Sequence, residues 1–231
     1  MRSLRHHDHG PEVMFLQRLL NKQGADPYVR EDGDYGPRTA AAVRAFRQRR
    51  GLGGSGEQVD GSVWAALGAV DEIRHPVRGF AQPTDTSCWS AAATMMTGTV
   101  MSVGTGRARL ARNGTLRAGL DNVETFVQGM GWHLVNQSSA PAAPVLMNAV
   151  RRGPLWVAFV GTHFGHAVVF SGMLTDNASD GTGTVFIVHD PWPPGRGAGS
   201  RYGTTYLGQQ VWLRSRTLPR PVPAMVGYAA Q

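Results

Sequence analysis

The chain of 231 residues contains a single cysteine, Cys88. A lone thiol cannot form an internal disulfide, so the fold must be held together by a packed core instead of by cross-links. The hydrophobic content of 42% is sufficient for such a core, and the length allows one large or two small domains. Cys88 itself is then either a buried, inert side chain or a nucleophile.

The residues around Cys88 favour the nucleophile. Residues 91–96 are strong helix formers, and Thr86 or Ser87 is a natural N-cap, which places Cys88 in the first turn of a helix. The dipole and the free N–H groups of such a turn favour thiolate over thiol. Gln82 lies upstream, beyond a proline, where its side-chain amide could help the Cys88 N–H to bind an oxyanion.

The segment from Gln82 to Trp89 resembles the nucleophile segment of papain-like cysteine peptidases, in which a glutamine precedes a Cys-Trp helix start by the same interval. Ser87-Cys88-Trp89 matches the papain signature, whereas Asp85-Thr86 replaces the usual Cys-Gly. Without that second cysteine the segment is more similar to the compact bacterial families, the AvrRpt2-like and C39-like peptidases. From this resemblance we expect Trp89 to contact the substrate.

The second half of the chain predicts a sheet. Runs of β-branched and aromatic residues predict strands over residues 155–160, 166–170 and 184–188. They follow a helical half, so the pattern is α+β, which is also the order of a papain-like fold. The other expected elements are helices over 120–127 and 145–150, a helical turn over 108–112, a short strand over 132–135, and a strand or short helix over 206–213.

His166 is the predicted general base, because it follows Gly165 at the start of a strand and can project toward a cleft. The run Gly-His-Ala-Val-Val also resembles the way in which papain-like and C39-like enzymes present their histidine. His163 and His189 are the other histidines considered for this role. Asp190 is predicted to accept the Nδ1–H of His166 and so to fix the tautomer that receives the thiol proton.

The residues that follow Asp190 extend the resemblance. Asp190-Pro191-Trp192 is similar to the Asp-Pro-Trp element of the AvrRpt2-like peptidases, and we expect Trp192 to contact the substrate. Cys88, His166 and Asp190 are therefore the predicted catalytic residues, with Gln82 as the oxyanion partner.

The first 70 residues predict a small module of three short helices. Val13, Leu16, Leu19 and Leu20 form one apolar stripe, Pro37 opens a second helix, and a third carries Val63, Trp64 and Leu67. The order of these residues around the loop Asp32-Gly33-Asp34-Tyr35-Gly36-Pro37 resembles the peptidoglycan-binding domain 1 family. The resemblance implies a module that docks onto the cell wall. The alternative is a helical cap for the catalytic domain.

Four residues of this module are expected to line the binding groove: Asp34, Tyr35, Arg38 and Thr39. An EF-hand calcium loop starting at Asp32 is excluded, because its sixth and twelfth positions, Pro37 and Val43, should be Gly and Glu.

We therefore predict an α+β protein, with a small three-helix N-terminal module followed by a papain-like domain made of a helical half and an antiparallel sheet half. The expected boundaries are residues 1–70 for the module, 71–81 for a linker, 82–216 for the catalytic domain and 217–231 for a C-terminal tail.

The sequence leaves three other mechanisms open. His163, His166 and His189-Asp190 could bind a catalytic zinc, although this leaves Gln82 and the Cys-Trp pair unexplained. The same cysteine site could pass its acyl group to an amine, as a transglutaminase does. Finally, the second domain could be inactive and the protein a wall-binding adhesin. The cysteine mechanism needs no metal or cofactor, and we expect none.

The formal net charge of +7 is spread along the chain, without the clustered basic stripe of a nucleic-acid-binding protein. It does permit attraction to an anionic wall. No apolar run reaches the ~20 residues of a membrane span, and residues 1–9 lack the apolar region of a signal peptide.

These features predict a cysteine hydrolase that cleaves cell-wall peptides, with envelope proteins as the alternative substrate. We expect delivery by a dedicated secretion machine into the envelope or periplasm of a target cell. A secreted antibacterial toxin of this kind implies an immunity protein in the producer.

Overall fold

The computed structural model describes residues 1–54, 56–69, 71–98, 108–117, 120–136, 143–160, 165–192, 204–208 and 224–229. The chain divides into two compact units. The first consists of Met1–Ile73 together with Met173–Phe186, and the second consists of Arg74–Gly172 together with Ile187–Gln231.

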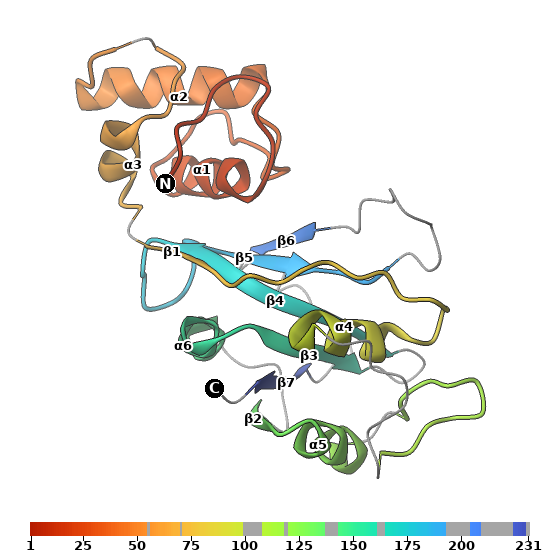
Figure 1. Cartoon of the computed structure of the whole chain (residues 1–231). Helices are drawn as coiled ribbons and strands as arrows, with labels where there is room; N and C mark the ends of the chain where they lie inside the picture. The colour runs from red at the N-terminus through yellow and green to blue at the C-terminus, as the bar shows by residue number, and fades with distance from the viewer. Residues whose placement is uncertain are drawn as a thin grey trace. The chain divides into compact units, whose positions relative to one another are not determined.

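The N-terminal part of the first unit is helical, as predicted. It contains α1 (Pro11–Lys22), α2 (Pro37–Arg50) and α3 (Gly61–Leu67) (Figure 1). The apolar stripe of α1 is fully buried and packs with residues of α2 and α3, because each of these short helices exposes one polar face and must cover the other. The buried side chains of the three helices include Val13, Leu16, Leu19, Leu20, Val43, Phe46, Val63, Trp64 and Leu67.

The buried amide of Gln17 holds the second half of the loop between α1 and α2. Gln17 Nε2 has three acceptors within hydrogen-bond distance of its two hydrogens: Asp32 Oδ1 (2.8 Å), the Asp34 carbonyl (2.9 Å) and Thr39 Oγ1 (3.1 Å). Gln17 Oε1 accepts from the Gly33 N–H (2.9 Å). Gly33 has a φ of 77°, and a Cβ there would lie 3.2 Å from the Gly10 carbonyl oxygen. The loop therefore requires glycine at this position for two reasons, its backbone conformation and its close packing.

Helix α3 depends on its N-cap, Asp60, whose carboxylate accepts from the N–H groups of Ser62 (2.9 Å) and Val63 (3.1 Å). The Ser62 hydroxyl also donates to Asp60 Oδ1 (2.5 Å), and this bond, followed by the one from the Val63 N–H, lowers the pKa of Asp60 to about 2. We predict that Asp60→Ala lowers the free energy of unfolding by about 1 kcal/mol. Asp60→Asn should lower it by much less, because an asparagine side chain can still cap the helix. Urea unfolding at neutral pH measures both.

The pH dependence of this cap gives a further check on the same prediction. Because the folded-state pKa is depressed, the carboxylate's contribution is present above its ordinary value of 3.8 and disappears as the pH falls through about 2. The stability difference between wild type and Asp60→Ala should therefore shrink in acid. An equal difference at pH 7 and pH 2 contradicts the assignment of Asp60 as the cap.

The first unit also includes the hairpin between β4 (Gly165–Thr175) and β5 (Thr184–His189), over residues Met173–Phe186. Arg18 of α1 is buried, forms an ion pair with Glu31 (2.6 Å) and donates to the carbonyl oxygens of Thr182 (3.3 Å) and Thr184 (3.5 Å). Lys22 Nζ lies 2.5 Å from Asp176 Oδ2. The compact unit thus extends beyond the predicted domain of residues 1–70.

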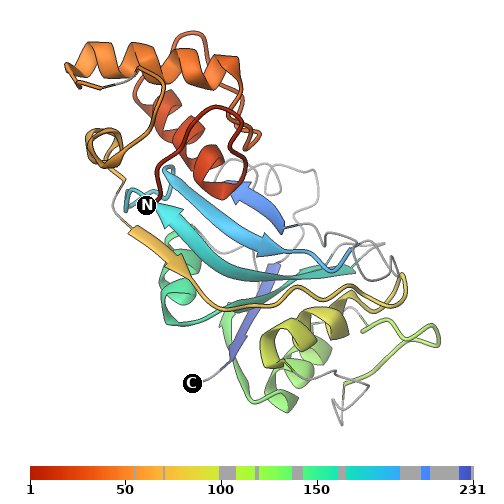
Figure 2. The same ribbon diagram turned by 45° about the horizontal axis from the view of Figure 1, so that its top comes forward.

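The strands form one sheet in the order β2-β7-β3-β4-β5-β6, and β1 also pairs with β4 (Figures 1 and 2). The pairs β2–β7, β3–β4 and β3–β7 are antiparallel, so the predicted α+β class is confirmed. The remaining strands are β1 (Asp71–Arg74), β2 (Trp132–Asn136), β3 (Leu155–Val160), β6 (Thr204–Gly208) and β7 (Ala224–Ala229). The helices of the second unit are α4 (Cys88–Thr97), α5 (Leu120–Gly129) and α6 (Ala143–Arg152).

Three local predictions differ from the structure. Residues 71–74, expected in the linker, form β1, and residues 224–229, expected in the tail, form β7 between β2 and β3. Both strands are short and pair with segments far away in the sequence, which local patterns do not reveal. In place of the expected helical turn over 108–112, Leu110 pairs with Leu116 in an isolated antiparallel bridge.

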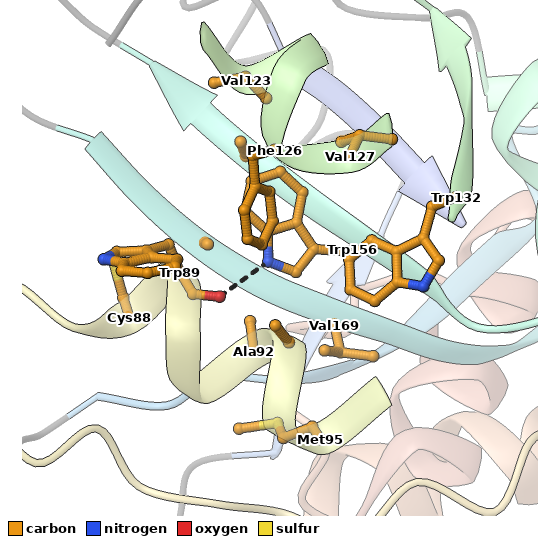
Figure 3. Close-up of a cluster of buried hydrophobic side chains, with 13 residues drawn as sticks. Cys88, Trp89, Ala92, Met95, Val123, Phe126, Val127, Trp132, Trp156 and Val169 are labelled. Carbon is orange, nitrogen blue, oxygen red and sulfur yellow. Dashed lines mark hydrogen bonds between the residues drawn. The ribbon is translucent and has the colours of Figure 1, made fainter. Parts of the chain in front are cut away.

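The core of the second unit lies where α4 and α5 pack against the sheet (Figure 3). The rings of Trp89 and Phe126 meet edge to face, with their centroids 5.5 Å apart, and the ring centroids of Phe126 and Trp156 are 5.0 Å apart. Trp156 Nε1 donates to the Trp89 carbonyl (3.1 Å). This aromatic core fixes the start of α4, which carries Cys88. Among the residues that the structure describes, no helix has the length and apolar character needed to cross a membrane.

Candidate active site

Helix α4 begins at Cys88, as predicted. Ser87 occupies the N-cap position, but its side chain makes no capping bond. Its backbone (φ −103°, ψ 15°) lies outside the extended region that directs an N-cap side chain toward the first helical N–H groups. The Ser87 hydroxyl bonds to Thr84 instead, donating to the Thr84 carbonyl (3.1 Å) and accepting from the Thr84 N–H (3.0 Å).

Trp89 is a core residue, which differs from the expected contact with substrate. Its side chain is only 5% exposed, and its Nε1–H donates to the Gly114 carbonyl (3.1 Å). On the other side of Cys88, Thr86 Oγ1 donates to the Asn113 carbonyl (2.8 Å). The loop at 113–114 therefore holds both flanks of the cysteine, and Trp89 acts as an anchor for the helix start.

His166 lies near the beginning of β4, opposite Phe159 of β3, and connects Cys88 to Asp190. Its Nε2 lies 2.8 Å from Asp190 Oδ1, and the Cys88 side chain is its other hydrogen-bond partner. The nitrogen that faces Asp190 is thus Nε2 and not the predicted Nδ1. Nε2 is the ring nitrogen farther from the backbone, which lets it reach Asp190 at the end of β5.

The pKa of His166 is the balance of two opposing effects. Burial alone would lower the pKa of this imidazole, but the hydrogen bonds and negative charges of Asp190 and Cys88 outweigh burial and raise it to about 9. At neutral pH the ring is therefore an imidazolium. A protonated imidazole beside the Cys88 side chain can act as a general acid.

Asp190 directly follows β5, and its carboxylate is fixed from two sides. Besides His166, Asp190 Oδ1 accepts from the Trp192 backbone N–H (2.9 Å) across Pro191. The Pro191 carbonyl accepts from the Gln82 N–H (2.9 Å), which ties the segment before the cysteine to the segment that carries the aspartate. Trp192 itself is 51% exposed, so its indole is accessible to a substrate.

Gln82 is buried, with 1% of its surface exposed. Its Nε2 donates to the Thr84 carbonyl (2.7 Å), while its buried Oε1 has no hydrogen-bond partner within the described residues. The amide nitrogen carries a second hydrogen, which a developing oxyanion would need.

The alternative histidines differ from His166 in their surroundings. Burial lowers the pKa of His189, which favours the neutral ring. His163 lies outside the described residues. Within the described parts of the chain, no group of three or more His, Cys, Asp or Glu side chains is arranged to hold a metal ion.

The four predicted groove residues of the N-terminal module fall into two pairs. Asp34 and Arg38 are exposed, and Asp34 Oδ1 lies 2.6 Å from His9 Nδ1. Tyr35 and Thr39 are buried, which corrects their prediction as groove-lining residues. The Tyr35 hydroxyl donates to the Glu57 carbonyl, and Thr39 bonds to Gln17, so both shape the loop from inside. Burial, with the nearby Asp8, raises the pKa of Tyr35 above its ordinary value.

Family models match both parts of the chain in the predicted order. A peptidoglycan binding domain family matches residues 9–67, and the family described as papain-like cysteine protease AvrRpt2 matches residues 72–202. The second match covers more than half of the chain. The protein belongs to the AvrRpt2 family of papain-like cysteine proteases. A search of curated proteins found no match.

This AvrRpt2-family protein thus combines a peptidoglycan-binding domain with a cysteine protease domain. Sequence reasoning missed the residues that hold its site in place: Thr84, Asn113, Gly114 and Trp156. Their contribution comes mainly through backbone carbonyls and through a buried indole, for which residue type gives no signal. For Ser87 the sequence predicts only a role as a helix cap.

Proposed function

We propose that the protein hydrolyses amide bonds with Cys88 as nucleophile, His166 as acid and base, and Asp190 as the residue that orients His166. The observation that carries this proposal is the continuous hydrogen-bonded series from Cys88 through His166 to Asp190, in which the Nε2–Oδ1 distance is 2.8 Å. A thiol, an imidazolium and a carboxylate in this order are the components of a cysteine hydrolase.

The reaction follows from the charges. The Cys88 thiolate attacks the amide carbonyl carbon, and the carbonyl electron pair moves to oxygen. The Cys88 N–H and the Gln82 amide stabilise that oxyanion. When the intermediate collapses, the C–N bond breaks and His166 gives its proton to the leaving amine. His166, now neutral, takes a proton from water, which attacks the thioester and releases the acid and the thiolate.

We propose wall stem peptides as the substrate. The match to the peptidoglycan-binding domain and the net charge of +7 support recruitment to an anionic wall. Envelope proteins are the second candidate, because the protease family alone supports protein substrates. If an amine replaced water at the thioester, the same residues would perform acyl transfer.

Incubation of the wild type with purified peptidoglycan, and separately with a generic protein substrate, tests the substrate, with Cys88→Ala as the blank. Soluble wall peptides detected by mass spectrometry in the wild-type reaction alone support the proposal. Cleavage of the protein without wall fragments would restrict the activity to proteins. A new covalent adduct with an added primary amine, in place of the hydrolysed product, would indicate acyl transfer.

Arg38 and Asp34 are the proposed contacts of the wall-binding module, because they are the exposed pair of the predicted groove. We predict that Arg38→Glu weakens sedimentation of the full chain with peptidoglycan by about tenfold, the value of one lost charge-assisted contact. The matched control is Arg49→Glu, an equal change of charge at an exposed position of the same helix. Equal losses in both variants would attribute binding to net charge and not to a groove.

We also propose that the protein acts as an antibacterial effector in the envelope of a target cell, delivered by a specialised secretion route and neutralised in the producer by an immunity protein. Targeting the wild type to the periplasm of a Gram-negative host with an added export signal tests this role. Lysis with the wild type but not with Cys88→Ala supports it. Normal growth in both cases would refute it.

A further inference from the structure

Among the residues that the structure describes, a single hydrogen bond fixes the orientation of the Gln82 side chain. The amide is buried, its Oε1 has no partner among the described residues, and its Nε2 donates to the Thr84 carbonyl at 2.7 Å. An amide rotated by half a turn would place Oε1, a second acceptor, against that carbonyl oxygen. The Thr84 carbonyl therefore decides which end of the amide is the donor end.

The position of Thr84 is in turn controlled by Ser87. The Ser87 hydroxyl donates to the Thr84 carbonyl (3.1 Å) and accepts from the Thr84 N–H (3.0 Å) and from Thr84 Oγ1 (3.0 Å). The Ser87 N–H also lies 3.3 Å from the same carbonyl oxygen. A serine at this position would ordinarily cap α4, but its hydroxyl forms no capping bond and is used to close the turn from Thr84 to Ser87.

We infer that Ser87 is a positioning residue for catalysis, which acts through the Thr84 carbonyl to orient the Gln82 amide toward the oxyanion. The inference rests on the proposed role of Gln82. Ser87 immediately precedes Cys88, whose N–H is the first proposed oxyanion donor. Through Thr84 the Ser87 hydroxyl also orients the second proposed donor, the Gln82 amide. Loss of that hydroxyl leaves the Thr84 turn and the amide free to adopt other orientations, and the catalytic stabilisation by Gln82 weakens.

Two reactions of the same thiolate separate this role from a merely structural one. With p-nitrophenyl acetate, the thiolate forms a C–S bond to the carbonyl carbon and an oxyanion develops on the carbonyl oxygen. The C–O bond to the aryl group then breaks, and p-nitrophenolate leaves. With iodoacetamide, the thiolate forms a C–S bond at a saturated carbon, and iodide leaves without any oxyanion. Only the first reaction depends on Gln82, whereas both depend on Cys88 and on the imidazolium of His166.

The test measures both rate constants for wild type, Ser87→Ala, Gln82→Ala and the double variant. We expect Gln82→Ala to lower the acylation rate about 10²-fold, the typical effect of removing one oxyanion donor. Ser87→Ala should lower it about tenfold in the wild type, but by no more than about twofold when Gln82 is already alanine, because coupled residues are not additive. Alkylation by iodoacetamide should stay within about twofold of wild type in both single variants.

Because Ser87→Ala could disturb folding, a second pair of variants at the same position tests the role of the hydroxyl independently. Ser87→Thr keeps the hydroxyl and should restore acylation, whereas Ser87→Val has the same shape without it and should behave like Ser87→Ala. The inference is overturned if Ser87→Ala acylates at the wild-type rate, if the loss persists in full beside Gln82→Ala, or if alkylation falls in parallel. If Gln82→Ala has no effect, the oxyanion role and this inference both fail, while loss of acylation in Cys88→Ala still upholds the proposed nucleophile.

Discussion

Replacement of Cys88 by alanine is expected to lower the rate of amide hydrolysis at least about 10³-fold, because the covalent route through the thioester disappears and water has no comparable nucleophile in its place. The side chain is small and lies at the edge of the aromatic core, so its truncation should leave the fold intact. The rates of product release from the proposed wall-peptide substrate, measured at enzyme concentrations high enough to detect residual turnover, give the ratio of wild-type to Cys88→Ala activity.

The control for this prediction is Thr97→Ala, at the opposite end of the same helix, which should retain activity. Treatment of the wild type with a chelator tests whether the activity requires a metal ion. Activity that survives Cys88→Ala but is lost with chelator would refute the cysteine mechanism and favour a zinc site. Unfolding curves of the two variants confirm that a change in activity is not a change in stability.

Replacement of Asp190 by alanine is expected to lower kcat about 10²–10⁴-fold, the usual contribution of general acid–base catalysis by a correctly oriented group. It removes the Nε2 partner of His166 and a negative charge that raises the pKa of the ring. Asp190→Asn is the graded variant. Its Oδ1 can accept from both His166 and the Trp192 N–H, so the geometry is retained while the charge is lost.

The pH dependence of activity shows whether Asp190 only orients the His166 ring or also raises its pKa through its negative charge. In the proposed mechanism His166 must be protonated to supply the leaving amine with a proton. Activity should therefore be present below about pH 9 and decline as the pH rises through that value. Because Asp190 raises the pKa, this alkaline decline should move to lower pH in both Asp190 variants. An unchanged alkaline limb in Asp190→Asn, or a comparable loss of activity in His189→Ala, would contradict the assignment of the pair.

Local patterns were sufficient to predict the helix that begins at Cys88 and the strand that carries His166. Cys88 begins a helix because small residues with high helix propensity follow it, and His166 begins a strand because Gly165 precedes an apolar β-branched run. These are short-range preferences, which a sequence displays directly.

The contacts that give those components their roles are long-range, and the sequence did not display them. Trp89 is buried because Phe126 and Trp156, far away in the chain, pack beside it. The choice of Nε2 over Nδ1 depends on the relative placement of β4, β5 and α4. Likewise, Tyr35 and Thr39 turn inward because Glu57 and Gln17 meet them there, and no local pattern carries that information.

The hairpin of residues 173–186 limits where the two domains can be separated in a chimeric protein. The two family matches meet between residues 67 and 72, but the compact unit that contains the first match also holds residues 173–186, from the later part of the second match. A chimera joined at that point would separate Arg18 from the Thr182 and Thr184 carbonyls and Lys22 from Asp176. A wall-targeting cassette transplanted to another hydrolase would therefore carry a buried guanidinium without its carbonyl acceptors, unless the recipient is given a matching hairpin.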